Sequence, residues 1–196
     1  MLKLYQFPIS HYCEKARWAL ELKELPYRKV NLLPGMHVKK AKKIAANSKL
    51  PILKHDQQTI QGSADIITYL DQNFSRRSLT PQDPAEKKLA EAWESYADRE
   101  IGPSVRLLSY YTLLDHKELI VPMMTQDCAW YSGFMMNRAY PKMSVAMRDL
   151  MKINKESAEL ARQQISTALD NLVETLGDRE FLVGESFTGA DLSVAA

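Results

Sequence analysis

The stretch "FPISHYCEKARWAL", residues 7–20, decides the fold of this chain. The residues before it alternate as a β-strand does, and residues 11–24 carry apolar side chains at helical spacing. A strand that turns directly into a helix around a Cys-x-x-Cys pair is typical of a thiol-disulfide active site. Here Ser10 stands at the first position and only Cys13 remains. The sequence therefore places a hydroxyl where such a site has its exposed nucleophile.

The pattern that follows predicts an α/β domain over residues 1–74. Strands and helices alternate in the order β-α-β-α-β-β-α, which favours a mixed sheet of four strands. Two prolines in a polar, charged stretch predict a linker over residues 75–88. Residues 89–196 carry helical periodicity without strand signals, beginning with a helix expected from 85 to about 115. The fold class is therefore an α/β domain followed by an all-helical domain.

Composition excludes several classes of protein. Apolar residues make up 45% of the 196 residues and charged residues 26%, as in a globular chain. No apolar run approaches the roughly 20 residues of a membrane-spanning helix, and there is no signal region, so we expect a cytoplasmic protein without a membrane partner. Cys13 and Cys128 suggest no disulfide framework.

Charge is distributed unevenly along the chain. Residues 1–74 hold 12 Lys and Arg against 6 Asp and Glu, a net charge of +6, and the remainder has −4. The first domain is therefore the better host for an anionic ligand, although the lysines of residues 38–43 are also explained by a solvated helix face. No aromatic or arginine pattern accompanies them, which argues against nucleic acid.

Two interpretations of Ser10 remain open on spacing alone. At the tip of a helix, its side chain can simply cap the backbone, or its hydroxyl can donate a hydrogen bond to the thiolate of another molecule. Cys13, one turn further, is best explained as a buried, inert thiol, and Arg17 as a structural partner of an acidic residue. Pro51, directly before a predicted strand, and Ser63, the predicted N-cap of another helix, likewise have ordinary structural explanations.

Taken together, these pieces resemble the glutathione transferase family. The motifs that carry the resemblance are "LYQFPISHYCEKARWAL", "KLPIL" followed by "GSADIITYLD", and "FLVGESFTGADLS" near the end of the chain. The resemblance covers the whole chain and implies a thioredoxin-like N-terminal domain, a cis Leu50–Pro51 bond and glutathione as co-substrate, with no metal.

The resemblance also implies roles for individual residues. The chain resembles the serine-type, bacterial-like members of the family. Ser10 stands where those members place the catalytic hydroxyl that stabilises the glutathione thiolate. The glutathione-binding set is Ser10, Lys49, Leu50, Pro51, Gly62 and Ser63. A small hydrophobic electrophile is expected beside the helical domain, in a pocket that includes His11, Arg99, Leu107 and Tyr110.

Two departures from the family pattern matter. Gly62 replaces the acidic residue or Gln that commonly precedes the serine. The last predicted helix begins at "SFTGAD", where Thr188 can cap the helix, Asp191 can complete a capping box, and Phe187 and Leu192 can form a hydrophobic staple. This helix reaches only to Ala196, so the natural chain is expected to continue. A homodimer is expected. The alternatives are a non-catalytic binding or regulatory module and a glutathione-dependent thiol-disulfide oxidoreductase that uses Cys13.

Overall fold

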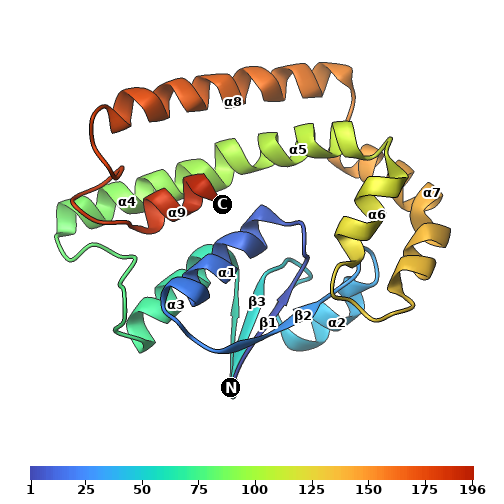
Figure 1. The fold of residues 1–196 in the computed structure, drawn as a ribbon, viewed down its shortest axis with the longest axis horizontal. Helices are drawn as coiled ribbons and strands as arrows, with labels where there is room; N and C mark the ends of the chain where they lie inside the picture. The colour runs from blue at the N-terminus through green and yellow to red at the C-terminus, as the bar shows by residue number, and fades with distance from the viewer.

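The computed structural model describes residues 1–196, and its first domain is built on a sheet of four strands. The strands lie in the order β2-β1-β3-β4 (Figure 1). β1 and β2 are parallel, whereas β3 is antiparallel to both β1 and β4. Their bounds are β1 (Leu2–Gln6), β2 (Tyr27–Asn31), β3 (Ile52–His55) and β4 (Gln58–Gln61). The predicted mixed sheet is confirmed.

Three helices complete this domain, in the predicted order: α1 (His11–Leu22), α2 (His37–Ile44) and α3 (Ser63–Asn73). Helices α1 and α3 pack against each other beside the sheet (Figure 1). By contrast, only Ala41 of α2 is buried, as its lysine-rich sequence predicts. The thioredoxin-like arrangement is therefore present.

The helical part begins earlier than the linker prediction allowed. Helix α4 (Pro84–Tyr96) starts inside residues 75–88, so the last five residues of the predicted linker are helical. The carboxylate of Asp83 accepts the N–H groups of Ala85 and Glu86 at 2.9 and 3.0 Å. Proline is well tolerated at the first position of a helix, because its missing N–H has no partner there. Here the proline starts a helix.

The remaining elements are all helical. The helix expected from 85 to about 115 is interrupted by a π-helical turn (Ala97–Ile101). Beyond it, α8 runs alongside α5, while α6 and α7 pair at one end of the molecule (Figure 1). These helices are α5 (Gly102–Leu113), α6 (Lys117–Thr125), α7 (Ser132–Met151), α8 (Lys155–Leu176) and α9 (Gly189–Ala195).

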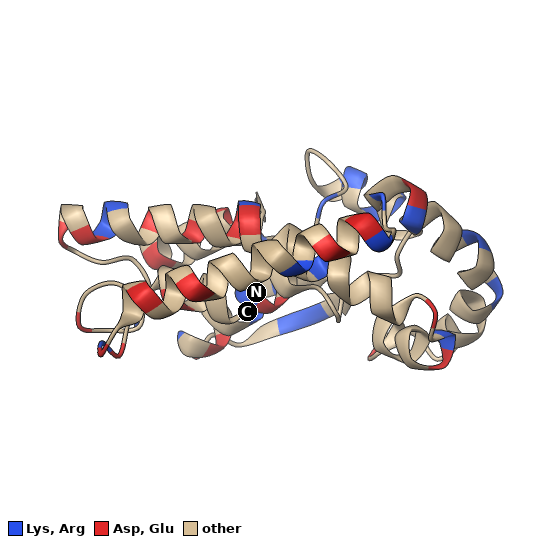
Figure 2. Ribbon diagram, turned by 90° about the horizontal axis from the view of Figure 1, so that it is seen from above, with Lys and Arg blue, Asp and Glu red and all other residues tan.

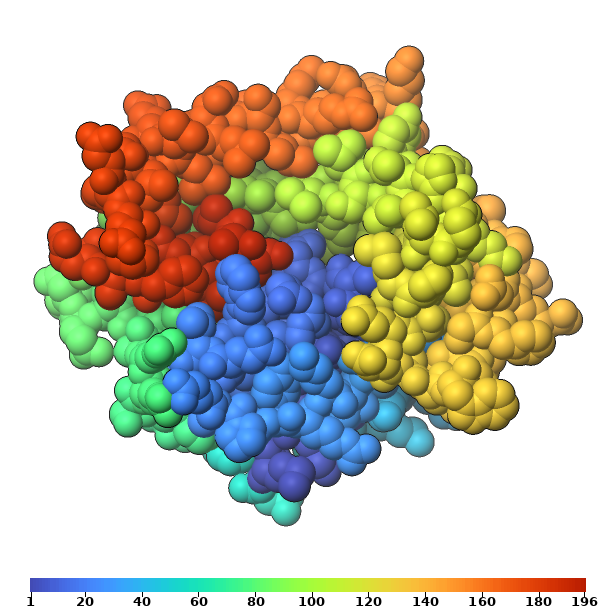
Figure 3. Space-filling model, viewed as in Figure 1, coloured from blue at the N-terminus to red at the C-terminus, as the bar shows by residue number.

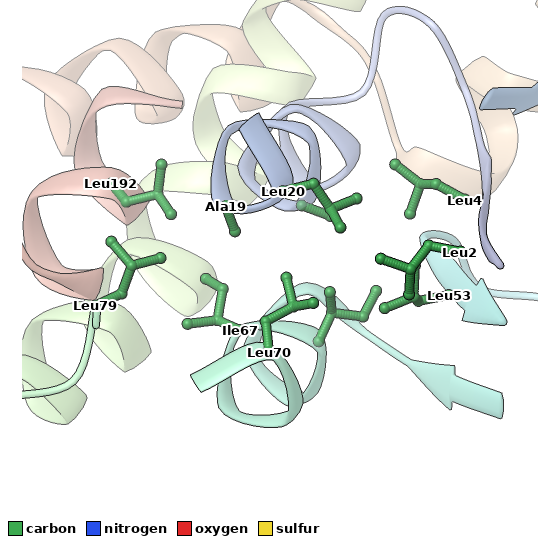
Figure 4. Packing of buried hydrophobic residues seen from close by; sticks show 11 residues of the cluster. Leu2, Leu4, Ala19, Leu20, Leu53, Ile67, Leu70, Leu79 and Leu192 are labelled. Atoms are coloured by element: carbon green, nitrogen blue, oxygen red, sulfur yellow. The ribbon is translucent and has the colours of Figure 1, made fainter. Parts of the chain in front are cut away.

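One apolar core extends from the sheet into the helical domain (Figure 4). Leu2 and Leu4 of β1 face Leu20 of α1, and the row continues through α3 to one residue of the linker and one of the second domain. Those two are Leu79, before α4, and Leu192 of α9, both at most 3% exposed. The domains are therefore joined by leucine packing rather than by a flexible linker alone.

A buried ion cluster reinforces this junction. Lys15 of α1 is 2% exposed, and its ammonium lies 2.6 Å from the carboxylate of Glu94 and 3.1 Å from that of Asp98. The hydroxyl of Tyr12 donates to the backbone carbonyl of Asp98 at 2.8 Å. The π-helical turn that contains Asp98 is thus held against α1.

The start of α9 confirms the capping box expected from the sequence. The hydroxyl of Thr188 accepts the N–H of Ala190, and the carboxylate of Asp191 accepts the N–H of Thr188 at 2.8 Å. Phe187 and Leu192 belong to the same apolar cluster, as a hydrophobic staple requires. This short helix is buried between α4 and α1.

The charged side chains differ between the helices (Figure 2). Acidic residues outnumber basic ones on α4 and on α8, whereas α7 carries three Lys or Arg and one Asp. The negative charge of the second domain therefore lies mostly along α4 and α8. None of the helices has the length and apolar character needed to traverse a lipid bilayer.

Candidate functional site

Ser10 forms the N-cap of α1, as its position in the sequence suggests. Its backbone is extended, with φ −91° and ψ 122°, and its hydroxyl oxygen accepts the N–H of Cys13 in a long bond of 3.4 Å. The hydroxyl proton is not used in that contact. The first N–H groups of the helix also point toward this side, and the positive end of the helix dipole favours an anion there. Ser10 can therefore cap the helix and still donate to a ligand.

Cys13 is fully buried, as predicted. Its sulfur accepts the N–H of Phe7 at 3.4 Å, and burial raises the pKa of the thiol. A reactive cysteine needs a lowered pKa and access to solvent, and Cys13 has neither.

Arg17 fixes the turn that carries Ser10. Its guanidinium donates to Gln6 Oε1 at 2.7 Å and to the carbonyl of Pro8 at 3.1 Å, and it pairs with the carboxylate of Glu14. The predicted acidic partner of Arg17 is thus Glu14. Since Gln6 ends β1 and Pro8 lies in the turn, one buried cation holds strand, turn and helix in a single geometry.

The loop before β3 is held by a side-chain bridge. The amide of Gln61 donates to the carbonyls of Asn47 and Lys49, at 3.0 and 2.8 Å. The Leu50–Pro51 bond that follows is cis, as the resemblance implied. Pro51 is buried, Leu50 is half-buried, and no protein hydrogen bond is formed by the backbone N–H or C=O of Leu50. Lys49 is exposed beside it.

The start of α3 corrects one prediction. The N-cap is Gly62, whose carbonyl accepts the N–H of Ile66 at 3.0 Å, and Ser63 is the first helical residue. Gly62 has φ +107°, a conformation that residues with a side chain rarely adopt, which explains the glycine where the family pattern has a larger residue. The side chain of Ser63 makes no capping bond and remains available at a helix N-terminus.

Strand pairing brings these three segments to the same edge of the sheet. At the carboxyl end of β1, Tyr5 pairs with Ile52, the first residue of β3, and Ile52 pairs in turn with Gln61, the last residue of β4. The Ser10 turn follows β1, the cis proline precedes β3, and Ser63 follows β4. The predicted glutathione-binding residues therefore surround one end of the sheet.

The helical domain borders this end through α5. Leu107, Tyr110 and Tyr111 belong to an apolar cluster against which Ile9 and Leu33 of the first domain also pack. In Figure 3 the dark-blue atoms around the start of α1 lie recessed between the lighter-blue atoms of their own domain and the yellow and yellow-green atoms of α5 and α6. Two of the predicted second-substrate residues, Leu107 and Tyr110, thus pack against the same apolar cluster as Ile9 of the Ser10 turn.

His11 follows Ser10 at the start of α1, and its imidazole is partly buried without a full set of hydrogen-bond partners. Its ring is 4.0 Å from the ring of Tyr12, and its Nε2 is buried without a hydrogen-bond partner. Burial, with help from the positive charges of Arg106 and Lys15, lowers its pKa to about 4. His11 is therefore a neutral imidazole near pH 7.

The fourth predicted residue, Arg99, is exposed in the π-helical turn, and no contact joins it to His11 or Tyr110. The charge that acts on both of those residues belongs to Arg106, which the sequence analysis missed. Its spacing of four residues from Tyr110 was the available signal, because such pairs share a helix face.

Comparison with known proteins identifies the first domain. Residues 4–78 match the family model described as "Glutathione S-transferase, N-terminal domain". This domain is therefore similar to the N-terminal domain of glutathione transferases. Among curated members, glutathione S-transferase U2 of Arabidopsis thaliana is 30% identical over 103 residues, which is 52% of this chain and 46% of that protein. A glutathione S-transferase of Pseudomonas putida is 31% identical over 87 residues, covering 44% and 39%. The matched region thus spans less than half of either relative.

The fold of the whole chain is that of solved glutathione transferase structures. The β-etherase LigF from Sphingobium sp. strain SYK-6 superimposes with a TM-score of 0.74 at 23% identity, covering 98% of this chain and 80% of that one. A glutathione S-transferase from Methylobacterium radiotolerans, solved in complex with glutathione sulfonate, has a TM-score of 0.67 at 21% identity, covering 98% and 74%. At this identity the likeness establishes the fold alone.

Proposed function

We propose that this chain is a glutathione transferase that binds reduced glutathione at the carboxyl end of β1 and conjugates it to a small, largely apolar electrophile. One observation carries the proposal: Ser10, the unpaired backbone of Leu50 and the start of α3 at Ser63 gather at one edge of the sheet. The family of the first domain supports it, as do relatives solved with glutathione or glutathione sulfonate bound.

Ser10 supplies the catalytic hydrogen bond. Its hydroxyl, which also hydrogen-bonds the buried Cys13 thiol, is assigned the role of donor toward the glutathione thiolate, and the N-terminus of α1 adds a favourable field. A hydrogen bond to a charged group contributes about 1–3 kcal/mol, and one unit of pKa corresponds to about 1.4 kcal/mol. A contribution of this size lowers an ordinary thiol pKa of about 8.5 to between about 6 and 8, so the thiolate fraction at neutral pH rises several-fold or more.

The remaining groups bind the tripeptide. The backbone N–H and C=O of Leu50, which no protein group satisfies, pair with the cysteinyl unit in the manner of an added strand, with Pro51 behind them. Ser63 and the N–H groups at the start of α3 hold the γ-glutamyl carboxylate, with Gly62 allowing close approach. Lys49 is exposed beside this path and reaches the glycyl carboxylate. The net charge of +6 on residues 1–74 favours an anionic tripeptide.

The reaction is a nucleophilic substitution or addition. The thiolate sulfur forms a bond to an electrophilic carbon, and the displaced group leaves with its electron pair when the reaction is a substitution. The thiol proton passes to solvent. Leu107 and Tyr110, which pack against the same apolar cluster as Ile9 of the Ser10 turn, form the wall against which the apolar electrophile lies.

The geometry disfavours thiol-disulfide exchange through Cys13, because its sulfur is buried and its pKa is raised. A non-catalytic binding module is the alternative to the transferase function. We also propose that the chain forms a homodimer. Light scattering after size exclusion tests the dimer: a mass twice that of the 22.4 kDa chain supports it, and a monomeric mass overturns it.

Calorimetry with reduced glutathione tests the site. The chain is titrated alongside Ser63→Ala and Ser166→Ala, the latter a matched control because Ser166 is exposed on α8. We expect micromolar to low-millimolar binding that Ser63→Ala weakens about tenfold, the loss of one charge-assisted hydrogen bond, and that Ser166→Ala leaves unchanged. Absence of heat at two temperatures, from a chain that circular dichroism shows to be folded, overturns the transferase proposal in favour of the binding module.

The pH dependence of turnover tests Ser10 separately. With 1-chloro-2,4-dinitrobenzene as electrophile, Ser10→Ala is expected to raise the apparent pKa of kcat/KM by about one unit and to lower the rate at pH 7 about tenfold. An unchanged profile contradicts the assigned role of this hydroxyl.

A further inference from the structure

Arg106 lies on the face of α5 that is turned toward the Ser10 turn. Residues four apart on a helix share a face, so Gly102, Arg106 and Tyr110 form one row. At one end of the row, a methyl group on Gly102 would meet His11 Nε2 at 2.9 Å. At the other end, Tyr110 belongs to the cluster against which Ile9 packs. Arg106 is thus flanked on both sides by residues that contact the segment around Ser10.

The charge of Arg106 acts on three groups around this place. It contributes to the lowered pKa of His11, after the larger effect of burial. It also opposes the rise in pKa that burial causes for the hydroxyls of Tyr12 and Tyr110. Titratable groups of both domains, on α1 and on α5, therefore lie within electrostatic range of this guanidinium.

No carboxylate of the protein neutralises Arg106. Other cations of the chain have such partners: Arg17 pairs with Glu14, and Arg148 with Asp115. The carboxylate that also acts on Tyr12 is that of Asp98, but Lys15 already holds it at 3.1 Å. The guanidinium is exposed and forms no ion pair, so its donors are free for a ligand.

The surroundings of Arg106 are otherwise apolar or aromatic. Leu107, Tyr110 and Tyr111, which are close to Arg106 in the sequence of α5, pack against the same apolar cluster as Ile9 and Leu33. Pockets for small molecules combine such apolar walls with a few placed polar groups that fix the orientation of the ligand. A guanidinium presents a planar fork of N–H donors that matches a carboxylate in two parallel hydrogen bonds.

We propose that Arg106 is the residue that recognises the electrophile, and that the preferred electrophile carries a carboxylate or a similar oxyanion on an apolar body. The proposal rests on the transferase function above and adds a substrate class to it. The apolar body lies against Leu107 and Tyr110, and its anionic group pairs with the guanidinium of Arg106. The carbon that reacts then faces the sulfur held at Ser10.

A matched pair of substrates tests this selectivity. In 4-chloro-3-nitrobenzoate and 4-chloro-3-nitrobenzamide, the glutathione sulfur bonds to the ring carbon, and chloride leaves with the electron pair of the broken C–Cl bond. We expect Arg106→Gln to reduce kcat/KM about 10- to 100-fold for the benzoate and less than about 3-fold for the benzamide. Arg106→Lys should recover part of the loss, because it keeps the charge but not the fork.

Two controls separate this role from others. Arg138→Gln removes an exposed arginine of α7 and should leave both substrates unaffected. The KM for glutathione should not change in Arg106→Gln. A raised KM for glutathione, or an equal loss with both substrates, overturns the proposal, because Arg106 then serves the tripeptide or the fold.

A binding experiment without glutathione gives an independent result. Fluorescence titration compares anionic 8-anilinonaphthalene-1-sulfonate with neutral N-phenyl-1-naphthylamine on the wild-type chain and on Arg106→Gln. Weakening of the anionic probe alone supports the anion site, even if calorimetry has refuted the transferase function. Equal affinities of wild type and variant for the anionic probe refute the anion site while leaving glutathione binding intact.

Discussion

Two of the places where the domains meet differ in chemistry. In the first, which we term the leucine contact, Leu79 and Leu192 pack on Ile67 of α3, and all three are at most 3% exposed. In the second, the site contact, His11 and Tyr12 of α1 meet Gly102 of α5. The leucine contact combines apolar side chains with hydrogen bonds of the Leu79 backbone, whose N–H donates to Asp71 and whose carbonyl accepts the N–H of Gly189. The site contact is built from rings, polar atoms and a helix backbone.

The unsatisfied groups of the chain gather on the side of the site. Both histidine nitrogens that are buried without a partner, His11 Nε2 and His37 Nδ1, belong to rings close to the Phe7–Ser10 turn. Each unpaired buried polar group costs about 1–3 kcal/mol. The leucine contact holds the domains together. The site contact can therefore retain buried polar groups that have no hydrogen-bond partner in the protein and are left for a ligand.

The largest expected effect comes from the ion cluster that reinforces the junction. Lys15→Ala removes a buried ammonium and leaves the carboxylates of Glu94 and Asp98 without it. Breaking a buried pair in this way costs about 3–5 kcal/mol of unfolding free energy, measured by urea denaturation. Lys87→Ala, which removes an exposed lysine 4.0 Å from Glu91, should cost less than about 0.5 kcal/mol. Equal losses in the two variants contradict the role given to Lys15.

A smaller effect is expected from the leucine contact. Leu79→Ala leaves a cavity between α3 and α9 and should lower the free energy of unfolding by about 3 kcal/mol. The matched control is Leu169→Ala on α8, whose side chain is 56% exposed and should lose less than about 1 kcal/mol. If Leu79→Ala leaves the urea midpoint unchanged, the leucine contact does not hold the domains.

The smallest effect concerns pH and the site contact. The pKa of His11 is lowered to about 4 in the folded chain, against 6.5 when unfolded, and burial also lowers that of His37. Between pH 6.5 and 4 the unfolded chain binds more protons at these groups, so stability falls as the pH falls. Urea titrations at pH 7, 6 and 5 should show this loss, on the order of 1–2 kcal/mol by pH 5. His11→Gln should reduce the change of unfolding free energy with pH. An unchanged slope of unfolding free energy against pH contradicts the role given to His11.

The sequence was sufficient for features set by local chemistry. The order of elements, Ser10 at the tip of α1 and the Thr188 capping box all depend on residues within a few positions of one another. Gly62 as N-cap depends on a backbone angle of +107° that no local pattern shows. The helix expected from residue 85 begins at Pro84, but the predicted linker extended to residue 88, because proline marks both loops and first helical positions.

The prediction of Arg99 rather than Arg106 for the second-substrate pocket shows most clearly what could not be predicted from the sequence. The sequence pattern placed Arg99 and Tyr110 on one long helix, where a regular α-helix would set them about three turns apart on a shared face. The π-helical turn at Ala97–Ile101 lies between a regular α4 and α5, and it breaks that phase. Arg106 and Tyr110 both follow the turn, so their mutual spacing is unaffected.

The π-helical turn has a consequence for the angular phase of α5. Each residue of an α-helix rotates the chain by about 100°, so removing one residue from this turn would restore a continuous helix and rotate everything beyond it by that angle. Gly102 would leave His11, and Arg106 and Tyr110 would swing away from Ser10 together. The number of residues in the π-helical turn, Ala97–Ile101, therefore determines which side of α5 faces the first domain.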